Sequence, residues 1–468
     1  MQINKKVSET MAMEQEEISR TQQEEKIKYM TTAPVHKLVC KLAVPTIISM
    51  LVTSFYNMAD TFFVGRINTS ATAAVGVVFS VMAFIQAVGF FFGHGSGNYI
   101  SRKLGAREYD IASTMAATGF VYAFLGGIVI AVCGLLFLEP FSRLLGSTPT
   151  ILPYTKAYLR IILLGAPFMT SSLVLNNQLR FQGSAAYAMV GIVTGAAINI
   201  VLDPFLIFTC RMGIAGAAAA TVTSQFISFC LLVAGSRRGG NIVIHLRRFS
   251  PNPYFLKEIV RGGLPSLCRQ GLASVSVTCL NHAAGAYGDA AIAGMSIVNR
   301  ITMFANSALI GFGQGFQPVC GMNYGAGKMK RVRDAYFFCV KWAAVFLVAV
   351  SVLGFAEAER IVAVFRKDDP EVIAVGTRAL RLQLLVFPFG AWIVICNMML
   401  QSIGKAVKAS IVAAGRQGLF FLPLIAVLPR LFGLFGVQIC QTIADICTLI
   451  LSIPLGVSVL NEMKRQEP

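Results

Sequence analysis

Two aspartates lie inside long apolar stretches of the chain, where a charged group needs a function or a partner. Asp60 and Asp203 are each followed, a few residues later, by a polar turn that contains an arginine. Asn199 precedes Asp203 by one helical turn, so the two side chains share a face. Pro204 has no amide hydrogen to donate to the carbonyl of Ile200. Two carboxylates, an amide and a freed carbonyl make an oxygen-rich group that can hold a cation or exchange protons.

The helices that carry these aspartates place further polar side chains nearby. At about 1.5 Å per residue, both carboxyl groups lie about 10 Å inside the same membrane boundary, close to the depth of Tyr158 and Thr221. Burial and the nearness of a second acid both favour the protonated form of a carboxyl group. The sequence therefore predicts a proton or cation site made of Asp60, Asp203, Asn199, Tyr158 and Thr221, in which Na+ would bind to Asp60, Asp203, Asn199 and Thr221. In the alternative interpretation, each aspartate caps or bridges helices.

The second half of the chain carries mostly the opposite charge inside its apolar stretches. Its embedded charged residues are Asp445, Arg269, Arg300, Lys341 and Arg416. We expect Asp445 to pair with Arg300 or Arg416, because a lone buried charge is costly. The long side chains of Arg269 and Lys341 can extend toward a membrane surface. A substrate cavity between the two halves is predicted to be lined by Tyr56, Asn57, Asn176 and Arg300.

The overall composition is that of a membrane protein. Of 468 residues, 55% are hydrophobic and only 13% are charged, about half the usual charged share of a soluble domain, and the mean hydropathy is +0.67. These values exclude a soluble globular domain, a disordered chain and a coiled coil. A spanning helix needs about 20 apolar residues. We predict an all-α polytopic membrane protein whose twelve transmembrane helices are 38–64, 70–98, 112–137, 156–179, 185–209, 213–235, 258–285, 289–318, 334–356, 376–401, 408–430 and 433–460.

Repeated residues divide these helices into two lobes of six. An offset of 220 pairs Gly105 with Gly325, and an offset of 221 pairs Asn176 with Asn397. Other pairs at these offsets are Pro45 with Pro265, Pro167 with Pro388, Gly183 with Gly404, and Gly213 with Gly433. Because six is even, both lobes enter the membrane in the same direction, which predicts a pseudo-two-fold axis along the membrane normal. The predicted organisation is an N-terminal tail (1–35), an N-lobe (36–235), a linker (236–257), a C-lobe (258–460) and a C-terminal tail (461–468).

The distribution of charge predicts the orientation. The net charge is +18, and Lys and Arg are more than twice as frequent in the loops on the side of the termini as on the other side. The positive-inside rule therefore places both termini in the cytoplasm. The stretch 1–35 has no apolar core of a signal peptide and is expected to be a flexible cytoplasmic tail with at most a frayed helix. The 11 scattered cysteines show no metal-binding or disulfide pattern, and no nucleophile, metal or phosphate-loop motif indicates an enzyme.

Several motifs resemble a known transporter family. They are MADTFFVGRI (58–67), GFFFGHGSGNYISRKLGA (89–106), INIVLDPFLIF (198–208), GIAGAAAATVTSQ (213–225) and GFGQGFQPVCGMNYGA (311–326). This combination resembles the multidrug and toxic compound extrusion (MATE) family over about residues 34–460, and its DinF-like branch most of all. The resemblance implies two six-helix lobes and a cation site in the N-lobe, where Asp60, Tyr158, Asn199, Asp203 and Thr221 match the family's residues. Another branch uses acids in helices 7 and 10, where this sequence has Arg269-Gln270 and Asn397.

The resemblance implies a secondary active multidrug efflux antiporter in a bacterial inner membrane. It would exchange H+ or Na+ for lipophilic, mostly cationic drugs by alternating access, without a tightly bound cofactor or a nucleic-acid partner, and as a monomer. The alternative is a flippase for lipid-linked precursors, which related two-lobe proteins perform. A flippase for anionic carriers should line its whole cavity with bases, whereas the N-lobe holds two acids, which favours cationic substrates.

Overall fold

The computed structural model describes residues 20–365 and 369–467, and all regular elements within them are helices. The first six long helices form the N-lobe. Their apolar composition means that none of them needs a polar face turned toward water. They are α2 (Val35–Gly65), α3 (Thr69–Gly105), α4 (Tyr109–Leu136), α6 (Leu152–Phe181), α7 (Ala185–Pro204), which continues into η1 (Phe205–Thr209), and α8 (Ile214–Ser236). The short α5 (Leu138–Leu144) joins α4 to α6.

The C-lobe repeats this order of long helices after a linker that holds only η2 (Leu246–Arg248). Its first elements are α9 (Pro253–Gly285), α10 (Asp289–Gly325), α11 (Met329–Ala356) and the short α12 (Ala358–Phe365). One span then consists of α13 (Pro370–Val386), η3 (Phe387–Phe389) and α14 (Gly390–Ser402), and the next consists of α15 (Ala406–Ala414), η4 (Gly415–Leu419) and α16 (Phe421–Phe432). The last helix is α17 (Leu434–Arg465). Ten spans in the described residues are long and apolar enough to cross a membrane. The 33-residue α9 and the 37-residue α10, which carry Arg269 and Arg300, complete the predicted twelve.

Matching contacts in the two lobes confirm the sequence repeat. Asn176 donates to the carbonyl of Ala188, twelve residues later, and its counterpart Asn397 donates to the carbonyl of Ala409. The helix-start glycines Gly213 and Gly433 share a left-handed φ of 56° and 59°, which a residue with a Cβ rarely adopts. The two lobes therefore use the same local solutions at the same relative positions.

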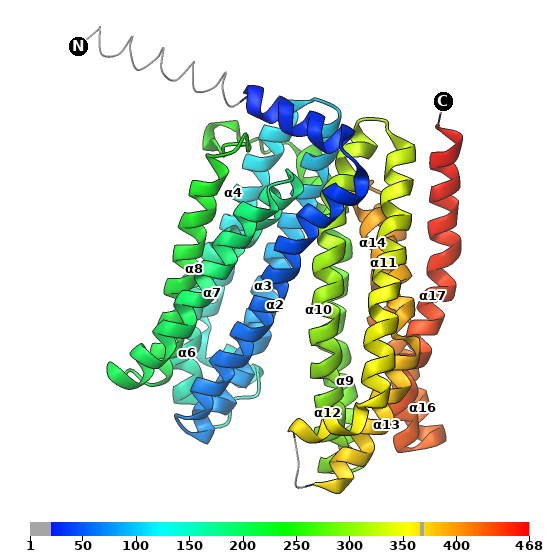
Figure 1. Ribbon diagram of the computed structural model, residues 1–468. Helices are drawn as coiled ribbons and strands as arrows, with labels where there is room; N and C mark the ends of the chain where they lie inside the picture. Colours follow the sequence, from blue (N-terminus) through cyan, green and yellow to red (C-terminus); the bar gives the residue numbers. More distant parts are fainter. Residues whose placement is uncertain (1–19, 366–368, 468) are drawn as a thin grey trace, which may run out of the picture.

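The lobes meet tightly near the face that carries both chain ends, which we call the terminal face (Figure 1). A Cβ on Gly105 would lie 2.0 Å from the carbonyl oxygen of Met322, and a Cβ on Gly325 would lie 1.9 Å from that of Arg102. These two contacts exchange under the offset of 220, as a pseudo-two-fold axis between the lobes requires. Only glycine allows the backbones of α3 and α10 to approach this closely.

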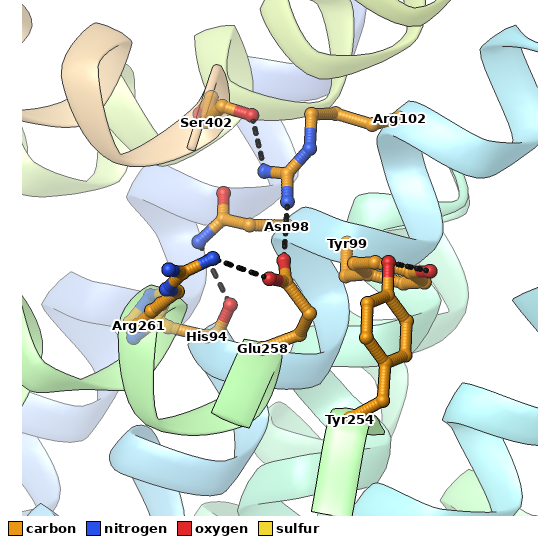
Figure 2. A network of polar contacts seen from close by, with 8 residues as sticks. All are labelled: His94, Asn98, Tyr99, Arg102, Tyr254, Glu258, Arg261 and Ser402. Carbon is orange, nitrogen blue, oxygen red and sulfur yellow. Dashed lines mark hydrogen bonds and ion pairs between the residues drawn. The ribbon is translucent and has the colours of Figure 1, made fainter. Parts of the chain in front are cut away.

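A polar network closes the same face between α3 and the C-lobe (Figure 2). Arg102 of α3 donates to the carbonyl of Ser402 at 2.9 Å and faces the carboxylate of Glu258 on α9 at 3.8 Å. Arg261 holds the same carboxylate at 3.1 Å. The hydroxyls of Tyr99 and Tyr254 lie 3.2 Å apart beside this group. The network orients charged groups of both lobes at the terminal face.

Away from the terminal face, α2 and α10 separate. Along α10, Gly315 and Gly311 pack on the backbone of Ala43 and Ile47 in α2. Further on, the contact passes through side chains: the hydroxyls of Ser307 and Ser54 lie 3.2 Å apart, and the rings of Phe304 and Phe55 meet edge-on at 5.7 Å. Beyond this point the facing side chains are exposed. We call them the interlobe wedge: Phe55, Met58 and Phe62 of α2, with Arg300, Met303 and Phe304 of α10. Figure 1 shows the lobes spreading toward this side.

The N-terminal segment differs from the flexible tail that the sequence predicts. Residues 20–32 form a helix that packs on the terminal face, whereas residues 1–19 lie outside the described residues. Lys26 donates to Ser184 and Asn241 on the N-lobe side, and burial lowers the pKa of this lysine to about 7. On the C-lobe side, Lys328 donates to the carbonyl of Thr31 at 2.8 Å. The helix docks because it provides backbone oxygens to C-lobe donors, a feature that apolar periodicity does not reveal.

Several helix ends also lie beyond the predicted limits. The predicted α3 stops at residue 98, but the helix continues to Gly105 because the polar residues of its last turns face the C-lobe instead of water. The predicted helix 376–401 is interrupted by η3 around Pro388, which has no amide to donate. The C-terminal tail predicted from residue 461 begins later, because α17 extends to Arg465.

The embedded acid of the C-lobe is held by one of its two expected partners. Asp445 of α17 accepts from Arg416 Nε at 2.8 Å and from its second nitrogen at 3.3 Å, and Gln441 donates to the same carboxylate at 2.8 Å. Arg416 lies in the π-helical turn η4, which directs its side chain toward α17. Arg300 takes no part in this pair. Asp445 therefore serves helix packing within the C-lobe.

We predict that Gly325→Ala loosens the terminal face. The new methyl group would overlap the carbonyl of Arg102, and overpacking of this kind costs about 1–3 kcal/mol. The purified protein should lose thermal stability, and spin labels at positions 110 and 330, on opposite lobes, should move apart. Gly271→Ala is the matched control, because a Cβ there meets nothing within 4 Å. Equal stability and spacing in both variants would contradict the close-packing argument.

We predict that Asp445→Asn lowers the yield of folded protein. The change leaves the guanidinium of Arg416, whose side chain is only 18% exposed, without its carboxylate, and breaking a buried pair costs about 3 kcal/mol. Size-exclusion profiles of detergent extracts and thermal unfolding measure the loss. Glu357→Gln breaks the exposed pair with Arg360 and should have almost no effect. Similar losses in the two variants would mean that the pair has no special structural weight.

Candidate functional site

Four helices of the N-lobe bring the predicted cation-site residues together. Asp60 comes from α2, Tyr158 from α6, Asn199 and Asp203 from α7, and Thr221 from α8. The last four are completely buried and Asp60 is 8% exposed. Gly216 of α8 allows this convergence, because a Cβ there would lie 2.8 Å from the carbonyl of Leu206, which follows α7. The structure therefore brings these five residues together in one buried cluster.

Asn199 connects the members of this cluster. Its amide nitrogen lies 3.4 Å from Asp203 Oδ1 and 3.5 Å from the hydroxyl of Thr221. Asp60 and Asp203 are close enough to interact electrostatically, and Tyr158 interacts electrostatically with both carboxyl groups. The two hydrogen bonds are long for a fully buried amide, whose preferred distance is about 2.9 Å. Asn199 therefore holds its two neighbours only weakly.

Three buried oxygens in the cluster have no hydrogen-bond partner among the described residues: Asp60 Oδ1, Asn199 Oδ1 and Asp203 Oδ2. An unpaired buried acceptor is costly, and a buried carboxylate even more so. A proton on each carboxyl group, or a bound cation with oxygen ligands, would remove that cost. The geometry therefore fits a group that takes up positive charge from outside the protein.

The backbone next to Asp203 is also irregular. The α-helix α7 ends at Pro204, and Phe205–Thr209 continue as the π-helical turn η1. Proline cannot donate the hydrogen bond that a regular helix would require at this point. Such turns break the regular ladder and are frequent at functional sites. The regular helix thus ends at the proline that follows the carboxylate residue directly.

The residues predicted to line the substrate cavity lie in different places. Tyr56, one turn before Asp60, is buried and interacts with Thr221, so it joins the cation-site cluster and not a cavity wall. Asn176 is also buried, and its side-chain amide donates a hydrogen bond to the carbonyl of Ala188. Asn57 is half-buried, and Arg300 is exposed in the interlobe wedge. The spacing of four residues between Tyr56 and Asp60 was the available signal for a shared face.

The described part of the C-lobe has no equivalent cluster. At the offset of 220, Asp60 corresponds to Leu280, Asn199 to Leu419 and Asp203 to Pro423. Arg269 lies near His94 and Arg180 and acts on both electrostatically, so the charge between the lobes on that side is positive. Within the described ranges, no group of three or more His, Cys, Asp or Glu side chains could hold a metal ion. The two lobes share a fold but differ in charge.

The chain is similar to multidrug export proteins along almost its whole length. The chain is 28% identical over 442 residues to the multidrug export protein MepA of Staphylococcus haemolyticus (strain JCSC1435), an alignment that covers 94% of this chain and 97% of that protein. It is 27% identical over 431 residues to MepA of Staphylococcus aureus (strain NCTC 8325 / PS 47), with 91% and 94% covered.

Solved structures show the same architecture. An outward-facing conformation of a multidrug resistance MATE family transporter of the MOP superfamily superposes with a TM-score of 0.87 at 27% identity, covering 93% of this chain and 98% of that one. A MOP superfamily transporter from Pyrococcus furiosus Vc1 (DSM3638), described as having a binding pocket of reverse polarity, gives a TM-score of 0.87 at 28% identity, with the same coverage.

The MatE family model matches this chain twice, over residues 45–205 and 265–427, once in each lobe. These two matches span most of the chain and agree with the internal repeat and with the two structural lobes. The all-helical fold and the similarity to exporters along almost the whole length agree with them. The protein therefore belongs to the MatE family and is a multi-pass membrane transporter for multidrug efflux.

Proposed function

We propose that this transporter is a secondary antiporter of the DinF-like branch that exchanges H+ or Na+ for lipophilic, mostly cationic drugs. The carrying observation is the set of three buried, unpartnered oxygens on Asp60, Asn199 and Asp203. A site that lacks only positive charge is suited to the coupling ion, which is cargo here and not a resident cofactor. The apolar side chains of the interlobe wedge provide an adaptable surface for lipophilic substrates.

Coupling requires that the ion bind the two conformations differently. In the conformation described here, the terminal face is closed by the Arg102 network and the lobes spread toward the opposite side. Uptake of a proton or Na+ at the cluster would relieve the unpaired carboxylates and thereby favour rearrangement of the N-lobe helices around them. Rearrangement of α2 would alter its drug-binding wall, since Asp60 and the wedge residues belong to the same helix.

We propose further that the protein resides in a bacterial inner membrane as a monomer with its terminal face in the cytoplasm. The excess of Lys and Arg in the loops of that face supports this orientation. The space between the lobes then opens to the outside, the side to which an exporter releases its substrate. The coupling ion would enter from the same side.

We predict that Asp203→Asn abolishes ion-driven drug efflux. The asparagine keeps the shape of a protonated aspartate but cannot release a proton or offer a charge to Na+. Uncoupler-sensitive ethidium efflux from cells should fall at least about tenfold, because the coupling between two binding sites typically changes an affinity by about that factor. Asp60→Asn should weaken efflux in the same direction. Purified Asp203→Asn protein should still bind ethidium.

Abundance in the membrane must be matched by immunoblot, and Asp110→Asn, an exposed acid at the terminal face, provides a control with the same chemical change. If Asp203→Asn protein lowered ethidium accumulation as well as the wild type does, the N-lobe coupling site would be wrong. Binding of anionic lipid-linked sugars without any binding of cationic dyes would instead support a flippase.

We predict the orientation of the loops from the same proposal. In a cysteine-free background, single cysteines at positions 245 and 328 should resist an impermeant maleimide in intact cells, because both lie at the terminal face. A cysteine in place of Asp289, at the start of α10 on the other side, should react. Reaction at 245 before permeabilisation would invert the proposed topology.

A further inference from the structure

Arg300 occupies an unusual position for a charged residue. It lies in the outer half of α10, relative to the terminal face, and its side chain is exposed. It makes no hydrogen bond or ion pair with any of the described residues. An unpaired guanidinium facing lipid at this depth would cost several kcal/mol, so a polar or water-filled environment is required.

The contacts of α10 determine which way Arg300 faces. Arg300, Phe304, Ser307, Gly311 and Gly315 follow one another at helical spacing of three or four residues and share one face. The last four of them touch α2, through the contacts at Phe55, Ser54, Ile47 and Ala43. Arg300 therefore continues the face of α10 that is turned toward the N-lobe and away from lipid.

The same contacts give its depth. The two helices run antiparallel, with Gly315 at Ala43, Gly311 at Ile47 and Phe304 at Phe55. One further turn along α10 brings Arg300 to the level of Met58 in α2. There α2 presents Met58 and Phe62, which are 58% and 56% exposed, so an apolar wall faces the guanidinium across the wedge.

No acid of the described residues is available to neutralise Arg300. Asp445, the embedded acid of the C-lobe, is held by Arg416 and Gln441. Asp60 lies near the same depth, but at 100° per residue it is about 160° round α2 from Met58, on the side turned into the N-lobe. The wedge therefore contains an exposed cation beside aromatic and thioether side chains. No anion of the described residues neutralises this cation.

We propose that Arg300 is an anion-recognition residue of the interlobe wedge, which determines how well lipophilic molecules that carry a carboxylate are exported relative to simple cations. The guanidinium would bind the carboxylate through two parallel hydrogen bonds, while the apolar body packs on Phe55 and Met58. A cationic group on the same molecule can lie over the ring of Phe55. This inference rests on the proposed export function and assigns a specificity-determining residue to it.

The test uses two dyes that differ only at this group. Rhodamine 110 has a free carboxylate, and rhodamine 123 is its methyl ester and a simple cation. Efflux of both is measured in cells that express the wild type, Arg300→Gln or Arg300→Lys at equal abundance. The ratio of rhodamine 110 to rhodamine 123 efflux should fall about tenfold in Arg300→Gln, as expected for loss of one charged hydrogen-bonded contact. Arg300→Lys should restore part of the ratio.

Lys341→Gln provides the matched control, since it removes another exposed embedded cation of the C-lobe from a different helix, α11. The ratio should not change in this variant. An unchanged ratio in Arg300→Gln, or failure of the wild type to export rhodamine 110 while exporting rhodamine 123, would overturn the inference. Failure to export either dye would instead count against the proposed function.

A lipid phosphate has the same charge as the proposed carboxylate, so a binding arm distinguishes the two sources. Purified wild-type protein is reconstituted in phosphatidylcholine alone or with phosphatidylglycerol, and rhodamine 110 binding is measured by fluorescence polarisation. Equal affinity in both membranes supports a free carboxylate ligand. In contrast, phosphatidylglycerol could abolish rhodamine 110 binding to the wild type but have no such effect on Arg300→Gln. That result would assign the site to a lipid headgroup and overturn the proposal.

Discussion

The close approach of backbones at the terminal face is the constraint on which the rest of the arrangement depends. Gly105 and Gly325 allow α3 and α10 to meet almost without side chains between them, and Gly311 and Gly315 do the same for α10 and α2. Because α10 touches both helices there, the two lobes can separate only toward the other side. The width of the wedge and the exposure of its side chains follow from where this contact ends. The Arg102–Glu258 network adds orientation to an interface whose distance the glycines have already set.

Burial of charge organises the chemistry of the two lobes differently. In the N-lobe, two carboxyl groups are buried with no counter-ion among the described residues and leave oxygens unpaired. In the C-lobe, the one embedded acid is neutralised within its own lobe, and Arg300 remains exposed. The two lobes therefore have the same fold but different charge. Asp203 of the N-lobe, for example, corresponds to Pro423 of the C-lobe at the offset of 220. The repeat provides the scaffold, and substitutions within one copy provide the site.

The sequence predicted those features that local physics determines. Apolar length gave the twelve helices, the constant offset gave the lobes, and equal depth from the same boundary brought Asp60 and Asp203 together. It did not predict the docked helix over residues 20–32, because that helix is held by Lys26 and Lys328 through contacts distant in sequence. The prediction that Tyr56 lines the substrate cavity differs from its burial beside Thr221, because the rotation of α2 cannot be inferred without knowing which of its faces meets the N-lobe. The sequence named Arg416 as one of two possible partners of Asp445, and the choice between them depended on the π-helical turn η4, which no periodicity indicates.

The position of α2 links the cation-site cluster to the interlobe wedge. One side of this helix carries Asp60 toward Asp203, and nearly the opposite side carries Met58 toward Arg300. A helix is about 10 Å across, so a charge gained at Asp60 and a charge bound at Arg300 act on each other in part through the protein of α2. Positive charge at the cluster and negative charge in the wedge would attract each other, whereas a cation in the wedge would be repelled. Ion uptake would then weaken the hold on cationic substrates, which is the direction that antiport requires. A rigid element with one site on each side can thus couple the two sites without any direct contact between their ligands.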